Sequence, residues 1–134
     1  MIAVFDTNVL IAAIIMEGVC SKLLRRARAK EFYLISCPFI ITEIRHLLSK
    51  KFHLSREEVD SAIEPLNDAI TQIIDHRLKI TKICKDDDDD NVLACAIAEK
   101  AGYLVTGDSD LLKITRGLGI KIMTPRDFEK LFGQ

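Results

Sequence analysis

The stretch IAVFDTNVLIAAII, which runs from Ile2 to Ile15, contains the pattern that decides the fold. Its first four residues form a short apolar run of the β type, which ends at Asp6. Apolar residues at helical spacing follow at Ile11, Ile14 and Ile15. The stretch therefore predicts one strand, a turn that carries a carboxylate, and one helix.

Further β-type runs alternate with helical segments along the rest of the chain. These runs are Phe32–Ile35, Leu78–Thr81, Tyr103–Thr106 and Ile120–Met123. Strands that alternate with helices are joined by right-handed crossovers, which make the strands parallel and place helices on the faces of the sheet. We therefore expect a three-layer α/β/α sandwich with a parallel sheet of about five strands.

The intervening helices are predicted from apolar residues that recur every three or four positions. Ser55 and Glu58 have the spacing of a capping box at the start of one helix, and Thr124 before Pro125 marks the start of the last. Pro65 falls within a predicted helix and predicts a kink or a break there. The positions expected to face the core are Leu23, Leu24 and Ala27; Ile40, Ile44, Leu47 and Leu48; Val59, Ile63, Leu66, Ile70 and Ile73; and Val92, Leu93, Ala96 and Ile97.

The chain of 134 residues is expected to form a single domain over residues 1–134. Its net charge of −1 excludes a basic surface over the whole molecule, so a nucleic-acid site would need a local patch of cations. The four cysteines show neither a CxxC pair nor a metal-ligand spacing with histidine, and free thiols fit a reducing cytoplasm. We recognise no signal peptide and no apolar stretch of about 20 residues, so we expect a cytoplasmic protein without a membrane span.

Two acids directly follow predicted strands. Asp6 comes after the first strand and Asp108 after the fourth. The carboxyl ends of parallel strands meet at one edge of the sheet, where ligands bind in such folds. Asp90 opens a predicted helix three residues before Leu93, on the face that should point to the sheet, and Glu43 lies near the start of another helix. The four carboxylates are therefore expected to converge on this edge.

Like charges at close range repel one another, so a cluster of carboxylates is best explained by a divalent cation. Oxygen ligands without histidine or cysteine favour Mg²⁺ or Mn²⁺, and such ions point to phosphate chemistry. Asp89, three residues before Val92, is the next candidate ligand, and Thr7 and Asn8 can hydrogen-bond the first acid or cap its helix. Each acid alone also has an ordinary explanation, since an acidic run is typical of a solvated loop and helix cap, and Glu43 of an exposed first turn.

The strings FDTNVLIAAI, ITEIRHLLSKKF, DDDDDNVLACAIAEKAGYLVTGDSDLL and IKIMTPRDF occur in this order along the chain. They resemble the PIN domain, and more narrowly the toxin-like PIN proteins of prokaryotic toxin–antitoxin modules. The resemblance runs from Met1 to about Phe128. It implies an α/β/α sandwich with a parallel sheet and a metal-dependent ribonuclease activity.

The resemblance also assigns roles to residues. Its four acids fall on Asp6, Glu43, Asp90 and Asp108. The polar support falls on Thr7 and Asn8, and a further acid that often accompanies the site falls on Asp110. This chain departs from its relatives at Asp87, where they often carry proline.

We therefore expect hydrolysis of single-stranded RNA with one or two Mg²⁺ or Mn²⁺ ions, which leaves a 5′ phosphate and a 3′ hydroxyl without a covalent intermediate. The resemblance further implies a homodimer and an antitoxin protein as partner. An acidic crevice repels RNA, so a rim of cations is required. The candidates, which otherwise form a solvated helix face, are Lys22, Arg25, Arg26, Arg28, Lys30, Lys50 and Lys51.

Other functions compete with this interpretation. The chain could be a catalytically silent PIN domain that binds RNA or protein, or a housekeeping nuclease that is not paired with an antitoxin. A phosphatase with an aspartate nucleophile would need a second Asp two residues after Asp6, where this chain has Asn8.

Overall fold

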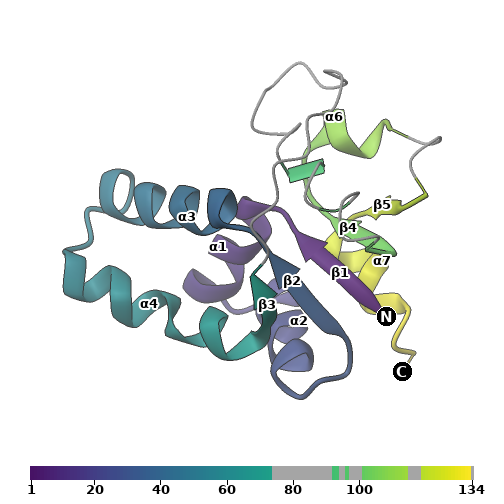
Figure 1. The fold of residues 1–134 in the computed structure, drawn as a ribbon, viewed down its shortest axis with the longest axis horizontal. Helices are drawn as coiled ribbons and strands as arrows, with labels where there is room; N and C mark the ends of the chain where they lie inside the picture. The colour runs from purple at the N-terminus through teal and green to yellow at the C-terminus, as the bar shows by residue number, and fades with distance from the viewer. Residues whose placement is uncertain (74–91, 94–95, 97–100, 115–118, 134) are drawn as a thin grey trace.

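The structure is a computed structural model that describes residues 1–73, 92–93, 96, 101–114 and 119–133. The described strands form one parallel sheet, which confirms the predicted fold class (Figure 1). In chain order they are β1 (Ile2–Phe5), β2 (Tyr33–Ser36), β3 (Ile70–Ile73), β4 (Tyr103–Val105) and β5 (Lys121–Met123). The predicted strand at Leu78–Thr81 lies outside the described residues.

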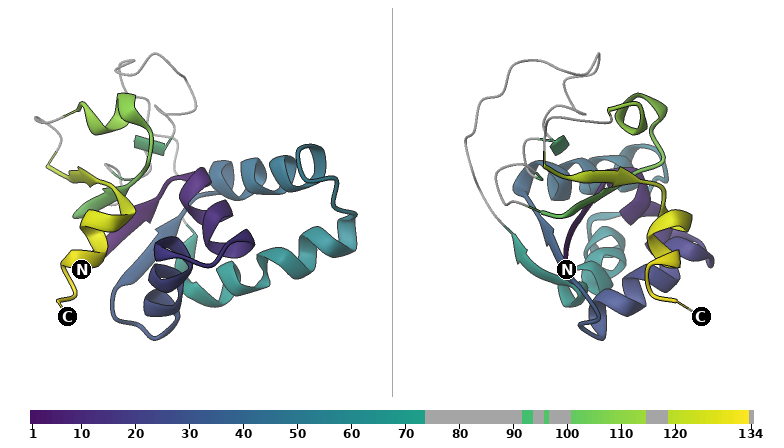
Figure 2. Two further views of the ribbon diagram at one scale, coloured as in Figure 1. Left: turned by 180° about the vertical axis from the view of Figure 1, so that it is seen from behind. Right: turned by 90° about the vertical axis from the view of Figure 1, so that its right-hand side faces the viewer.

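The described helices are α1 (Thr7–Ile15), α2 (Val19–Arg28), α3 (Pro38–Lys50), α4 (Arg56–Ala69), α6 (Ser109–Leu112) and α7 (Pro125–Lys130). Helix α2 contacts α1, α4 and α7, and these helices cover one face of the sheet (Figure 2). No single helix in the described part of the chain is long and apolar enough to cross a membrane. Helices α1 and α2 meet that criterion only as a pair, with 94° between them.

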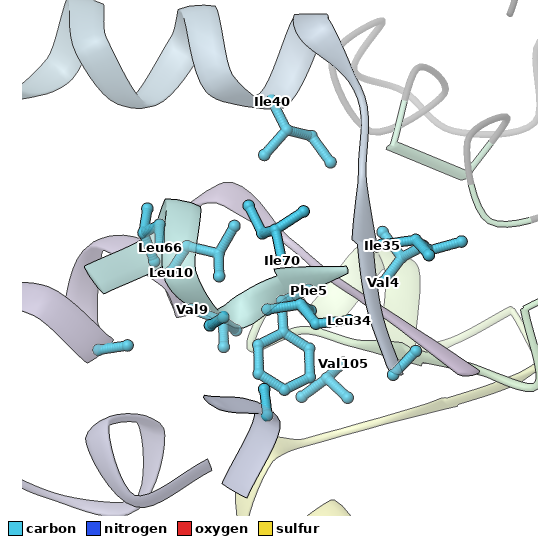
Figure 3. Packing of buried hydrophobic residues seen from close by; sticks show 14 of the residues in the cluster. Val4, Phe5, Val9, Leu10, Leu34, Ile35, Ile40, Leu66, Ile70 and Val105 are labelled. Carbon is cyan, nitrogen blue, oxygen red and sulfur yellow. The ribbon is translucent and has the colours of Figure 1, made fainter. Parts of the chain in front are cut away.

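Buried side chains occupy both faces of the sheet. Val4 and Ile35 point away from Phe5 and Leu34, as expected for alternate positions along a strand (Figure 3). All four are buried. The helical residues at 92, 93 and 96 are buried as well and belong to the same core.

The direction in which strands are added reverses between β1 and β4. From β1 the chain places β2 and then β3 on one side, whereas β4 and then β5 lie on the other side. In parallel sheets the connections on either side of such a reversal diverge, and they leave a crevice at the carboxyl ends of the strands. Asp6 follows β1, and Asp108 begins α6 shortly after β4, so the topology brings both acids to this crevice.

Three buried phenylalanines join the central strand to the last helix. The ring of Phe5 lies 5.6 Å from that of Phe32 and 5.8 Å from that of Phe128, between ring centres. Phe32 and Phe128 meet edge to face at 5.1 Å. Burial of each ring stabilises the fold by about 1.5–3 kcal/mol. Ile15, which is expected to share one helix face with Ile11 and Ile14, is 43% exposed at the end of α1.

Two predicted helix starts are confirmed. The hydroxyl of Ser55 accepts the N–H of Glu58 at 3.1 Å, and the Glu58 carboxylate accepts the N–H of Ser55 at 2.8 Å. These hydrogen bonds from Ser55 hold the pKa of the Glu58 carboxyl below its usual value. At the last helix the hydroxyl of Thr124 accepts the N–H of Asp127 at 3.2 Å, and Pro125 takes the first position.

One prediction for α4 is wrong, and another is tested only in part. Ile70 and Ile73 are predicted to continue its apolar stripe, but the helix ends at Ala69 and both residues belong to β3. The helical spacing of apolar residues runs on across the boundary, and pairing with β2 decides the conformation. Pro65 is predicted to kink or break the helix; it does not break it, since the helix runs from Arg56 to Ala69, and the kink stays a prediction. The carbonyl that loses its N–H partner belongs to the exposed Ser61, so water can satisfy it.

Candidate active site

Asp6 is anchored at the carboxyl end of the central strand. Its backbone N–H donates to the carbonyl of Val105 at 2.9 Å, and its own carbonyl accepts the N–H of Val9 at 3.0 Å. Its side chain is the N-cap of α1, and Oδ1 accepts the backbone N–H of Thr7 at 2.7 Å. Only 8% of the residue is exposed. The carboxylate is therefore fixed between β1 and β4.

Thr106 links Asp6 to Asp108. Its hydroxyl donates to Oδ2 of Asp6 at 2.7 Å, and the same hydroxyl oxygen accepts the backbone N–H of Asp108 at 3.0 Å. Thr106 is fully buried, and its backbone N–H donates to the carbonyl of Met123 at 2.9 Å. One chain of hydrogen bonds therefore sets the positions of both acids where the strand order reverses.

Asp108 caps the short helix α6. Its Oδ1 accepts the backbone N–H of Asp110 at 2.7 Å and that of Leu111 at 3.3 Å. Asp108 and Asp110 are both half-buried. Oδ2 of Asp108 forms no hydrogen bond with any of the described residues.

Helix capping explains these acids only in part. Asp6 and Asp108 are both N-caps, and aspartate is common at that position. Serine, asparagine or threonine would serve there without a charge. Two of the donors to Asp6, Thr7 and Thr106, are neutral. A buried carboxylate costs free energy that a cation would offset, so its burial favours a ligand role.

The remaining predicted ligands are less well placed. Glu43 is half-buried in the second turn of α3, which begins after β2 and packs against α1. Asp89 and Asp90 lie outside the described residues. Within the described ranges, no three His, Cys, Asp or Glu side chains are grouped closely enough to hold a metal ion. The structure thus brings together Asp6 and Asp108, while the roles of the other acids stay predictions.

Two buried hydroxyls lie next to this edge of the sheet. Thr7 supports Asp6 through its backbone N–H, whereas its own hydroxyl is buried and has no hydrogen-bond partner among the described residues. The hydroxyl of Ser36, at the carboxyl end of β2, is also buried and has no hydrogen-bond partner among the described residues. Buried hydroxyls normally have partners, so the partners of these two belong to residues outside the described ranges or to a bound ligand. Asn8, also predicted to support the site, is exposed.

Arg26 and Lys22, two of the cations predicted to bind RNA, are paired with acids of this chain. Arg26 donates to both carboxylate oxygens of Glu129 in α7, at 2.7 and 2.6 Å, and to Glu31 at 2.7 Å. Its guanidinium lies 4.8 Å from the ring centre of Phe132, and Lys22 lies 3.2 Å from Glu129. The hydrogen bonds between Arg26 and Glu129 raise the pKa of the arginine and lower that of the carboxyl. These contacts connect α2 to α7. They explain the presence of Arg26 and Lys22 without a role in RNA binding.

The other predicted cations are exposed. Arg25 and Arg28 each form one longer ion pair, at 3.6 and 3.7 Å. Exposed pairs of this kind contribute about 0–1 kcal/mol, so they would not prevent contact with RNA. Lys50 and Lys51 lie at the end of α3 and form no ion pair with any described residue. Lys30 is exposed as well, and RNA binding by these five residues stays a prediction.

Thr106 is the site residue that was not predicted from the sequence. The available signal was a threonine at the end of an apolar run, two residues before Asp108. A buried threonine at a strand end needs a hydrogen-bond partner, and the neighbouring strand end supplies Asp6.

The fold and the site define a parallel α/β protein with two linked acids at a topological switch point. A family model described as the PIN domain matches residues 3–110, and the chain belongs to this family. The chain is 28% identical over 141 residues to Uncharacterized protein MJ1680 of Methanocaldococcus jannaschii, with 96% of this chain and 90% of that protein covered. It shares its fold with the crystal structure of VapBC2 from Rickettsia felis bound to a DNA fragment from their promoter. That match has a TM-score of 0.64 and 20% sequence identity, and it covers 91% of this chain and 97% of the other.

Proposed function

We propose that this chain is a Mg²⁺- or Mn²⁺-dependent endoribonuclease that hydrolyses single-stranded RNA to 5′-phosphate and 3′-hydroxyl ends. The observation that carries the proposal is the hydrogen-bonded connection from Asp6 through Thr106 to Asp108 at the switch point of the sheet. Membership of the PIN domain family supports the nuclease class.

The chemistry of the donors fits a hard divalent cation. Asp6 and Asp108 offer carboxylate oxygens, which Mg²⁺ and Mn²⁺ prefer as ligands. Thr7, directly after Asp6, adds a buried hydroxyl oxygen. We propose that these two acids, with Glu43 and Asp90, hold the ion. Once bound, it would supply positive charge to the phosphate and make water a better nucleophile.

The chain's own residues would position the reacting groups. Thr106 holds one oxygen of Asp6, the N–H of Thr7 holds the other, and both acids are anchored to strand ends. A rigid arrangement of this kind needs little rearrangement when the substrate binds, which favours catalysis. No side-chain nucleophile is required, because water attacks the phosphorus in line with the departing 3′ oxygen.

We further propose that the nuclease is the toxin component of a toxin–antitoxin system, acting as a cytoplasmic homodimer that an antitoxin protein inhibits. The resemblance of the sequence motifs to toxin-like PIN proteins supports this role. A housekeeping nuclease without an antitoxin is the alternative. Growth arrest upon induced expression, relieved by co-expression of an adjacent gene, would support the toxin. Growth that continues while RNA is cleaved in vitro would favour the housekeeping enzyme.

The nuclease proposal is tested by incubating single-stranded RNA with the purified protein, with Mn²⁺ or with EDTA. Cleavage should require the cation and should be lost in Asp6→Asn and in Asp108→Asn. Glu64→Gln is the matched control, because it removes one exposed carboxylate from α4 and should cleave like the wild type. Equal cleavage by all four proteins would refute the proposal. RNA that is bound but never cut would identify a catalytically silent PIN domain.

A further inference from the structure

Helices α3 and α4 form a hairpin that extends away from the sheet to one end of the molecule (Figure 1). The residues from Lys50 to Arg56 form its tip, which we call the hairpin tip. Helix α3 begins at Pro38, directly after β2, and so it leads from the acidic edge of the sheet to the tip. Its 13 residues correspond to a length of about 20 Å.

The hairpin is held as a rigid unit close to its tip. Arg45 of α3 donates to Asp60 of α4 at 2.8 Å, which joins the two helices. The capping box between Ser55 and Glu58 fixes the start of α4. The backbone N–H of Leu54 donates to the carbonyl of Leu48, in the last turn of α3, at 3.1 Å, which closes the connection. Side chains at the tip therefore project from an ordered turn.

The hairpin tip combines an exposed aromatic ring with several exposed cations. Phe52 is 37% exposed, and the ammonium of Lys51 lies 5.9 Å from the centre of its ring. Lys50, His53 and Arg56 are also exposed. Lys50, Lys51 and Arg56 form no ion pair with another described residue. All four cations of α2, by contrast, do form ion pairs.

The backbone of the tip holds a side chain where glycine is the usual residue. His53 has a φ of 58°, in the left-handed region that follows many helix ends. A residue with a side chain costs about 1–2 kcal/mol there, and asparagine or glycine would avoid much of it. The chain thus keeps an aromatic, hydrogen-bonding side chain beside Phe52 at some expense of stability.

We infer that the hairpin tip is a binding surface for single-stranded RNA, on which Phe52 stacks with a base while Lys50, Lys51 and Arg56 contact phosphates. The inference rests on the proposed nuclease function and names the part of the chain that holds its substrate. An aromatic ring among cations on an exposed turn suits single-stranded nucleic acid, because every base has a face for stacking and every linkage carries a charge. An acidic protein would use the cations but would leave the exposed ring unexplained.

The position of the tip has a consequence for substrate length. The cut phosphate would lie at the acidic edge near Glu43, whereas the tip begins seven residues further along α3, which corresponds to a helix rise of about 10 Å. The tip therefore grips nucleotides away from the cut, and only a substrate long enough to reach both places gains from it. Cations at the tip also stand clear of the metal site, where they would compete with the bound ion.

The test measures RNA binding separately from cleavage. All variants carry Asp108→Asn and are kept in EDTA, and the probe is a fluorescein-labelled oligouridine of about 20 nucleotides, longer than the ~4–16 that one small domain covers. Fluorescence anisotropy gives the Kd at several salt concentrations. Phe52→Ala should weaken binding about 5- to 100-fold, whereas Phe52→Tyr, which keeps a stacking ring, should bind like the parent.

The charges are tested with a pair of triple variants. Replacing Lys50, Lys51 and Arg56 by glutamine should reduce the slope of log Kd against log salt by about 2, because each phosphate contact on a single strand contributes about 0.7. The matched control replaces three exposed cations elsewhere on the surface by glutamine and should leave the slope unchanged. Those cations are Lys121, Arg126 and Lys130. Thermal unfolding of each variant checks that the fold is retained.

The outcomes separate this inference from the proposed function. Equal loss in both triple variants, or unchanged binding in Phe52→Ala, would overturn the tip as an RNA surface even if the wild type cleaves RNA. Loss confined to the tip variants would support it even if no cleavage were found. Unchanged RNA binding together with weaker binding of a polyglutamate peptide by the tip variants would overturn it in favour of an acidic protein partner.

Discussion

Replacing Thr106 by valine should weaken both the stability of the protein and its cleavage of RNA. Valine has nearly the same shape, so the fully buried position stays filled and no cavity opens. What disappears is the donor to Oδ2 of Asp6, now at 2.7 Å, and the acceptor for the N–H of Asp108, now at 3.0 Å. The substitution therefore removes two hydrogen bonds and leaves the packing in place.

The size of the effect follows from the burial of the two partners. A hydrogen bond to a charged group contributes about 1.5–3 kcal/mol, and Asp6 is only 8% exposed, so water replaces the lost donor poorly. The N–H of Asp108 belongs to a half-buried residue and contributes about 0.5–1.5 kcal/mol. We expect the metal-free protein to lose about 2–4 kcal/mol of unfolding free energy at neutral pH. Cleavage should fall about 10- to 100-fold, as when other groups that orient metal ligands are removed.

The assay compares wild type, Thr106→Val and Thr106→Ser by urea unfolding in EDTA, followed by circular dichroism. Serine keeps the hydroxyl and loses one methyl group, so it should cost about 1 kcal/mol and retain most of the cleavage activity. The order of stability should be wild type, then serine, then valine. A valine variant that is as stable as the serine variant and cleaves RNA like the wild type would refute the role given to this hydroxyl.

Three further substitutions test other parts of the structure. Glu129→Gln leaves Arg26, whose side chain is 15% exposed, without its charged partner, and urea unfolding should show a loss of about 2 kcal/mol at pH 7. Arg26 lowers the pKa of Glu129 below its usual 4.5, so the ion pair stabilises the fold above pH 4.5, and this stabilisation disappears as the pH falls through the lowered value. Below pH 4.5 the free energy of unfolding should therefore depend less on pH in the variant than in the wild type. Equal pH dependence of the two proteins would contradict this. Ser36→Ala removes a buried hydroxyl without a partner among the described residues and should be neutral or stabilising by up to about 1 kcal/mol in the same assay, whereas a clear loss would show that the hydroxyl is bonded. His53→Gly relieves a φ of 58° and should raise the Tm, with a gain of about 0.5–1 kcal/mol, and an unchanged or lower Tm would count against strain at this residue.

The strands could be predicted where a short apolar run is bounded by polar residues or glycine. β1 has the predicted bounds, β4 and β5 differ from the prediction by one residue at one end, and β2 is shifted by one residue at both ends. The segment Ile70–Ile73 could not be assigned correctly, because its isoleucines also continue the helical spacing of α4. Pairing with β2 overrides that local pattern, and pairing depends on residues far away in the sequence.

The positions of the two acids in the candidate site could be predicted from the sequence, whereas the hydrogen bonds that join them could not. Asp6 and Asp108 follow from their positions after parallel strands, because topology alone places strand ends on one edge. The bond from Thr106 to Asp6 depends on the register in which Phe5 lies beside Val105, and the sequence does not state that register. The ion pair between Arg26 of α2 and Glu129 of α7 could not be predicted for the same reason, because the two residues are 103 positions apart in the sequence.

The central claim is that acids from separate strand ends hold a divalent cation, and crystals soaked in Mn²⁺ test it most directly. An anomalous difference map should show a peak about 2.1 Å from carboxylate oxygens of Asp6 and Asp108, with Glu43 and Asp90 completing the coordination. Asp6→Asn crystals treated in the same way should lose the peak. A map without density between these carboxylates at saturating Mn²⁺, in crystals of the wild type, would contradict the account.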